Sequence, residues 1–212
     1  MLTRHFLALL FLLAFAPPGT CGPVKILMLG TSLTQGYGLP PGVEIPALLQ
    51  AKLKAAGVDS KVINAGVSGD TSTDAASRLD WSLADHPDAA IVEVGSNDAL
   101  RGIPPAETER SISTILAKLE AQHVPTLLLG MKAPRNLGSA YVRSFDAIYP
   151  RLAKRYGTML YPFLLEGVVL NPKLNQADGM HPNPAGAKII AEHIFPYAKA
   201  LVRKARVRRT AK

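Results

Sequence analysis

The chain has 212 residues, of which 48% are hydrophobic and 19% are charged, a composition that excludes a disordered or fibrous protein. This length suits one domain with a sizeable core, and the single cysteine, Cys21, excludes an internal disulfide or a metal site built from several thiolates. Six of the 24 basic residues behind the net charge of +8 lie in residues 203–212, which leaves 18 basic residues against 16 acidic ones elsewhere.

The N-terminal residues have the pattern of an export signal. Arg4 supplies a basic start, and residues 6–16 form an apolar run that is shorter than the roughly 20 residues needed to span a bilayer. Ala14-Phe15-Ala16 fits a cleavage signal, and cleavage nearer Cys21 is an alternative. We therefore expect residues 1–23 to be the signal peptide of a periplasmic or secreted protein, with an uncleaved anchor as the alternative.

Short apolar segments then alternate with segments of helical periodicity. Buried strands are predicted at residues 24–29, 61–64, 89–94, 126–129 and 159–161. The last helix is predicted to open at Asn183-Pro184, an N-cap followed by proline at the first helical position. This alternation predicts an α/β domain over residues 24–202, with a parallel sheet covered by helices on both faces. In such sheets, ligands bind beyond the carboxyl ends of the strands.

Three of these strand ends lead into loops with candidate functional residues. Ser32 follows the first strand, where its hydroxyl either faces the ligand-binding crevice beyond the strand ends or caps the next helix. Gly69 follows the second strand and allows a ligand to approach the backbone, or forms a simple turn in which Asp70 caps a helix. Asn97 follows the third strand, where its amide either donates to a developing oxyanion or forms a local turn.

A fourth segment places Asp178 and His181 three residues apart, directly before the last helix. This spacing allows the carboxylate to fix the imidazole tautomer and to stabilise the imidazolium ion. A local loop contact and half of a metal site are the alternatives. Because no second histidine or carboxylate cluster shares the segment, we expect no metal ion and no cofactor.

Taken together, the four segments resemble the SGNH (GDSL-type) hydrolase family from Val24 to Leu201, and most closely its bacterial thioesterase I, arylesterase and lysophospholipase branch. The resemblance implies a flavodoxin-like three-layer αβα sandwich with five parallel strands in the order 2-1-3-4-5. This order makes strands 2, 1 and 3 neighbours, and it gathers the first three loops at one edge of the sheet.

The resemblance also implies roles for the candidate residues. Ser32 is expected to be the nucleophile, with His181 as its base and Asp178 as the partner of the histidine. The expected oxyanion hole consists of Ser32, Gly69 and Asn97. One departure from the family pattern is Thr31, which stands where these enzymes usually have aspartate directly before the nucleophile.

The expected function is hydrolysis of a small-molecule acyl ester or thioester through an acyl-enzyme, with aryl esters, lysophospholipids and acyl-thioesters as substrate classes. Alternatives are a carbohydrate O-deacetylase and a non-catalytic lipid- or glycan-binding protein on the same fold. We expect residues 203–212 to be a solvated basic tail, open to weak attraction by anionic surfaces. Specific nucleic-acid binding is not indicated, because no aromatic or motif context accompanies the charge.

Overall fold

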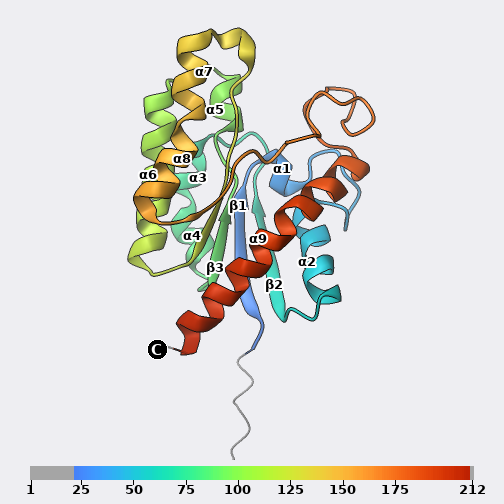
Figure 1. The fold of residues 1–212 in the computed structure, drawn as a ribbon, viewed down its shortest axis with the longest axis vertical. Helices are drawn as coiled ribbons and strands as arrows, with labels where there is room; N and C mark the ends of the chain where they lie inside the picture. The colour runs from blue at the N-terminus through green and yellow to red at the C-terminus, as the bar shows by residue number, and fades with distance from the viewer. Residues whose placement is uncertain (1–21, 211–212) are drawn as a thin grey trace, which may run out of the picture.

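A computed structural model describes residues 22–210 of the chain (Figure 1). Residues 1–21, which make up nearly all of the predicted signal peptide, lie outside the described residues. Among residues 22–210, no helix is both long enough and apolar enough to cross a membrane.

The centre of the fold is one sheet of five parallel strands in the order β2-β1-β3-β4-β5. In chain order the strands are β1 (Val24–Gly30), β2 (Ser60–Gly66), β3 (Ala89–Val92), β4 (Thr126–Leu129) and β5 (Met159–Tyr161). The three inner strands are buried almost throughout, as their continuous apolar runs predict for strands covered on both faces. The predicted fold class and strand order are confirmed.

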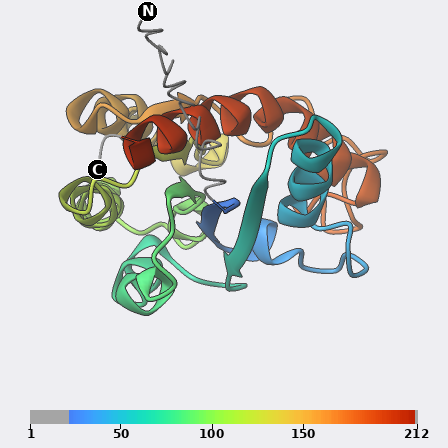
Figure 2. The ribbon, with the colours of Figure 1, turned by 90° about the horizontal axis from the view of Figure 1, so that it is seen from below.

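Helices cover both faces of this sheet and complete a three-layer sandwich (Figure 2). On one face α2 (Ile45–Ala55) packs against α9 (Pro184–Thr210). The opposite layer consists of α3 (Ser72–Ser77), α4 (Leu79–Leu83), α6 (Pro105–Ala121), α7 (Ser139–Asp146) and α8 (Ile148–Tyr156). The loops contain the short helices α1 (Ser32–Gln35) and α5 (Ser96–Leu100) and the 3-10 turn η1 (Arg135–Leu137).

The start of α3 differs from the prediction. Thr71 caps this helix, because its hydroxyl accepts the N–H of Asp74 while the Asp74 carboxylate accepts the N–H of Thr71. Asp70, the predicted cap, instead forms an ion pair with Arg78 at 2.6 Å. The prediction for Asp70 was wrong because a reciprocal capping box begins one residue later.

The basic run at residues 203–212 is not a separate solvated tail as far as the structure describes it. Up to residue 210 it forms the last turns of α9, where Ala205 is buried in line with Val202. The guanidinium of Arg209 donates to the carboxylate of Asp88 at 2.7 Å and to backbone carbonyls just before β1. The prediction of a separate solvated tail was wrong for residues 203–210, because the count of charges did not take into account the buried side chains of Val202 and Ala205, which pack the helix against the rest of the fold.

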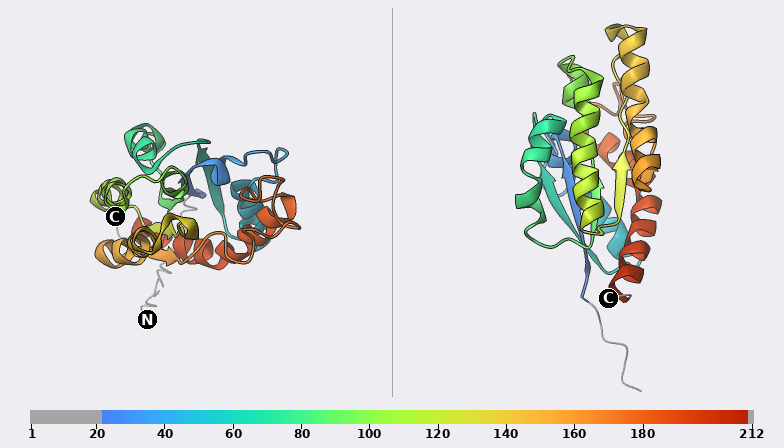
Figure 3. Two further views of the ribbon diagram at one scale, coloured as in Figure 1. Left: turned by 90° about the horizontal axis from the view of Figure 1, so that it is seen from above. Right: turned by 90° about the vertical axis from the view of Figure 1, so that its left-hand side faces the viewer.

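The topology brings four distant segments to the carboxyl edge of the sheet, which faces the viewer in the left view of Figure 3. The loops after β1, β2 and β3 are neighbours because these strands are paired side by side. The segment between β5 and α9, residues 162–183, reaches the same edge, where the side-chain amide of Gln176 donates to the carbonyl of Tyr37 at 2.7 Å. All the predicted functional residues therefore lie at one edge.

Candidate active site

Ser32, His181 and Asp178 form a continuous chain of side-chain contacts. His181 Nε2 lies 3.0 Å from Ser32 Oγ, and His181 Nδ1 lies 2.5 Å from Asp178 Oδ2. An ionised carboxylate only accepts hydrogen bonds, so Nδ1 carries the proton and Nε2 of the neutral ring accepts the serine hydroxyl. This is the arrangement in which a histidine can remove the proton from a serine nucleophile.

The segment that carries Asp178 holds its carboxylate in place. Oδ1 accepts the backbone N–H groups of Met180 at 2.9 Å and of His181 at 3.0 Å. The hydrogen bond from the His181 ring is the main cause that lowers the pKa of Asp178 from 3.8 to about 2. The ring of Tyr37 lies against the imidazole, with 4.8 Å between the ring centroids. The imidazole is therefore oriented from two sides.

The candidate oxyanion donors come from three neighbouring loops. The N–H of Ser32 lies in the first turn of α1, where backbone N–H groups have no acceptor within the helix. Gly69 has φ of +86°, a left-handed conformation that favours glycine, and its carbonyl accepts a hydrogen bond from Arg101 at 2.7 Å. The side-chain amide of Asn97 uses one of its two N–H donors on the carbonyl of Asp70, at 2.8 Å.

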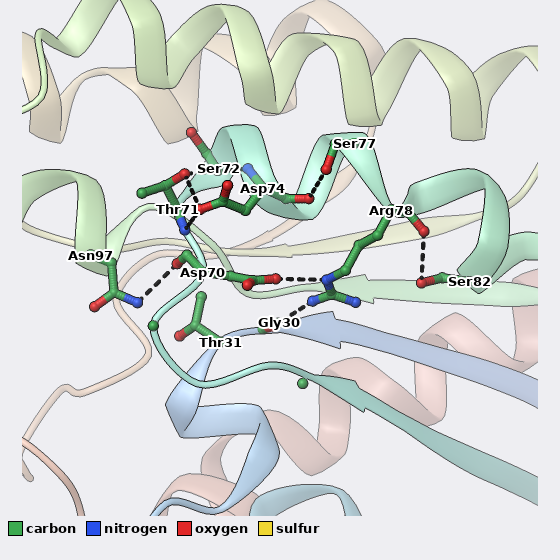
Figure 4. A network of polar contacts seen from close by, with 12 residues as sticks. Gly30, Thr31, Asp70, Thr71, Ser72, Asp74, Ser77, Arg78, Ser82 and Asn97 are labelled. Atoms are coloured by element: carbon green, nitrogen blue, oxygen red, sulfur yellow. Dashed lines mark hydrogen bonds and ion pairs between the residues drawn. The ribbon is translucent and has the colours of Figure 1, made fainter.

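A polar network fixes the Gly69 loop to the end of β1 (Figure 4). The guanidinium of Arg78 pairs with the carboxylate of Asp70 at 2.6 Å and donates to the carbonyl of Gly30 at 2.9 Å. Asn97 reaches the same loop from the opposite side through the carbonyl of Asp70. The role of Arg78 could not be predicted from the sequence, because no local pattern indicates a contact with residues 8 and 48 positions away.

The contacts of Asp98 are a second feature that could not be predicted from the sequence. Its side chain is buried, and its carboxylate accepts the N–H of Ser72 at 2.8 Å and the hydroxyl of Thr108 at 3.1 Å. Asp98 therefore joins the Asn97 segment to the start of α3 and to α6. These contacts keep the second and third loops in a defined relative position.

Thr31, the departure from the family pattern, is fully buried directly before Ser32. Its hydroxyl donates to the buried carboxyl of Glu93 at 3.0 Å. Glu93 was also missed, because a single acidic residue at the end of an apolar strand has no distinctive sequence pattern. Within residues 22–210, no cluster of three or more His, Cys, Asp or Glu side chains is arranged to hold a metal ion.

Comparison with known proteins identifies the family. A protein-family model described as the GDSL-like lipase/acylhydrolase family matches residues 28–189. The chain belongs to this family. The Escherichia coli (strain K12) protein named thioesterase 1/protease 1/lysophospholipase L1 is 39% identical over 178 residues, which cover 84% of each chain. The family predicted from the four sequence segments is therefore confirmed.

Two further relatives in this family are esterases by name. Esterase TesA of Pseudomonas aeruginosa is 37% identical over 178 residues, which cover 84% of this chain and 89% of that protein. The crystal structure of AlinE4, an SGNH-hydrolase family esterase, is similar with a TM-score of 0.72 and 44% identity, over 84% of this chain and 97% of that chain.

The contacts of Asp178 lead to a prediction about pH. Because the pKa of Asp178 in the folded protein is about 2, below its ordinary 3.8, the ionised carboxylate stabilises the fold above about pH 4. This contribution is lost as the pH falls toward about 2. Asp178→Asn should therefore lower the free energy of unfolding at neutral pH, by an amount that shrinks below about pH 4. Urea denaturation at a series of pH values measures this, and a pH-independent difference would contradict it.

Asn97 leads to a second prediction. Replacement by alanine removes a donor from the candidate oxyanion hole, and we expect kcat to fall by about 10²–10³-fold while the protein stays folded. Asn64→Ala is the control, since Asn64 Oδ1 accepts the N–H of Gly66 at 2.9 Å on β2, which β1 separates from β3. Near-normal kcat in Asn97→Ala would remove this residue from the oxyanion hole.

Proposed function

We propose that this chain is a serine hydrolase that cleaves carboxylic esters and thioesters through an acyl-enzyme. The observation that carries the proposal is the chain of contacts from Asp178 through His181 to Ser32, at 2.5 and 3.0 Å. A nucleophile in contact with a base, which is itself oriented by a third group, is the arrangement that activates serine. The activities named for the relatives, esterase and thioesterase, support the same reaction class.

In the proposed mechanism, His181 Nε2 takes the proton of Ser32 as Oγ attacks the acyl carbonyl carbon. The negative charge that develops on the carbonyl oxygen is stabilised by the N–H groups of Ser32 and Gly69 and by the side-chain amide of Asn97. The tetrahedral intermediate then expels the alcohol or thiol, which receives its proton from His181. Water, deprotonated by His181, attacks the acyl-enzyme and releases the acid.

Exposed apolar side chains support an apolar acyl or aryl substrate. Seven large apolar side chains are exposed among residues 22–210, and five of them come from the segments that form the site. These five, which we call the apolar rim, are Tyr37, Val67, Leu100, Leu170 and Met180, with exposed fractions between 43% and 79%. Exposed apolar side chains on the segments that carry the reactive groups favour a ligand with an apolar group beside its reactive carbonyl.

Hydrolysis of p-nitrophenyl esters from C2 to C12 tests the proposed reaction. We expect activity that includes the longer chains and that is abolished in Ser32→Ala, because no other group replaces the nucleophile. Activity confined to acetate esters and acetylated sugars would instead favour a carbohydrate O-deacetylase. A folded protein without hydrolysis of any ester, and without labelling of Ser32 by a fluorophosphonate, would favour a lipid- or glycan-binding protein.

A matched pair of variants tests the apolar rim. Leu170→Asn removes an apolar group that is 79% exposed on the segment that also carries Asp178 and His181, whereas Trp81→Ser removes one that is equally exposed on α4. We expect Leu170→Asn to lower kcat/KM by about 3–10-fold for esters of C8 or longer, with the acetate ester unchanged. Equal effects of the two variants would show that the rim does not contribute to chain-length preference.

We also propose that the chain is exported to the periplasm or secreted. The basic start and the short apolar run of residues 6–16 support export. N-terminal sequencing of the protein purified from a periplasmic fraction tests this, because a mature N-terminus between Pro17 and Val24 is expected. Recovery of an intact Met1 from the cytoplasm would contradict it.

We further propose weak association with anionic surfaces, which the exposed basic side chains at the end of α9 support. Arg203, Lys204 and Arg206 are exposed on the last turns of this helix. Co-sedimentation with anionic vesicles, compared with neutral ones, tests the association, and the binding should weaken with added salt. Equal binding to both kinds of vesicle would contradict it.

A further inference from the structure

Glu93 is a fully buried acidic residue outside the candidate catalytic residues. It directly follows β3, and its N–H donates to the carbonyl of Leu29 at 2.8 Å, which places it beside the end of β1. A carboxyl group in such a position is costly unless hydrogen-bond donors surround it. The residues that donate hydrogen bonds to the Glu93 carboxyl therefore indicate which part of the structure this buried group stabilises.

Among residues 22–210, all the hydrogen bonds to this carboxyl come from residues 31–34, which we call the nucleophile turn. Thr31, directly before Ser32, donates its N–H at 2.9 Å and its hydroxyl at 3.0 Å. Thr34, two residues after Ser32, donates its N–H at 3.2 Å and its hydroxyl at 2.8 Å. The Glu93 carboxyl thus binds the turn on both sides of the candidate nucleophile.

The surroundings offer these donors little besides Glu93: Ser96 Oγ lies 3.5 Å from the Thr31 hydroxyl, farther than the Glu93 oxygens. Thr31 and Thr34 are both fully buried, so water does not replace a lost acceptor, and an unpaired buried donor is costly. A Cβ added at Gly30 would lie 2.7 Å from Glu93 Oε2, so the strand end and the carboxyl are already in close contact. Burial raises the pKa of Glu93, and the hydrogen bonds from the two threonines oppose that rise.

We infer that Glu93 is a positioning residue that holds the nucleophile turn, so that Ser32 keeps its contact with His181 and its N–H stays at the oxyanion site. The inference rests on the proposed function of Ser32. It also gives Thr31 a role, because a threonine hydroxyl donates to the carboxyl, whereas the side chain of an ionised aspartate has no proton to donate.

Single hydroxyl deletions test this role with little change in side-chain shape. We expect Thr31→Val and Thr34→Val each to lower kcat by about 10-fold and to leave KM within about twofold, because a displaced nucleophile slows chemistry more than binding. The rate at which a fluorophosphonate labels Ser32 should fall in parallel. Thr126→Val is the matched control, since Thr126 is also buried but donates to the carbonyl of Val124, at 3.0 Å, at the start of β4.

Two substitutions of Glu93 separate positioning from simple packing. Glu93→Gln keeps the volume and one acceptor oxygen, and we expect about a 10-fold loss of kcat; Glu93→Leu removes every acceptor, and we expect about a 10²-fold loss. Adding Thr31→Val to Glu93→Leu should cause no further loss, because both changes break the same interaction. Circular dichroism and thermal unfolding show which variants fold. If Glu93→Leu does not fold, the kcat values of Thr31→Val and Thr34→Val test the positioning role of Glu93.

The inference is overturned if the wild-type enzyme is active and both threonine variants keep its kcat and labelling rate. It is also overturned if Thr126→Val loses as much kcat as they do, because the effect would then be general destabilisation. These results differ from failure of the proposed function itself, in which the wild-type protein neither hydrolyses esters nor reacts with the fluorophosphonate at Ser32.

Discussion

The pairing of β1 with both β2 and β3 is the constraint on which the site depends. Because all three strands are parallel, their carboxyl ends lie at one edge, and the loops that follow them meet there. Ser32, Gly69 and Asn97 are therefore neighbours although they are far apart in the chain. The fourth segment completes the arrangement from the start of α9, where Asn183 Oδ1 accepts the N–H groups of Ala185 and Gly186 at 3.0 and 3.1 Å.

Acidic side chains beneath the site give short elements a stability that they lack by themselves. The helices α1 and α5 have four and five residues, which is too short for a helix to be stable in isolation. Glu93 accepts hydrogen bonds from the α1 turn, Asp98 links α5 to α3 and α6, and Asp70 connects the Gly69 loop to Arg78. The cost of burying the Glu93 and Asp98 carboxyl groups, and of partly burying that of Asp70, is offset because donors from other elements of the fold satisfy them.

The last helix, α9, runs from the carboxyl edge of the sheet to the opposite edge. It begins three residues after His181, at the carboxyl edge, and ends at the opposite edge, where Arg209 binds Asp88 and the backbone before β1. The helix therefore serves both as a cover for the sheet and as the support of the segment that carries Asp178 and His181. This dual role explains why residues 203–210 of the basic run belong to α9.

The sequence by itself determined the strand and helix pattern, the four loop segments and the pairing of Asp178 with His181, because periodicity and short spacings are local properties. The choice of Thr71 over Asp70 as the cap of α3 is itself local, because the capping box joins Thr71 to Asp74, three residues later. Only the tertiary structure showed that Asp70 binds Arg78 and that α9 continues through the basic run. It alone also revealed the contact of Glu93 with Thr31, which spans 62 positions. Such contacts are decided by which strands become neighbours and by the need of each buried polar group for a partner, and neither is encoded in a local pattern.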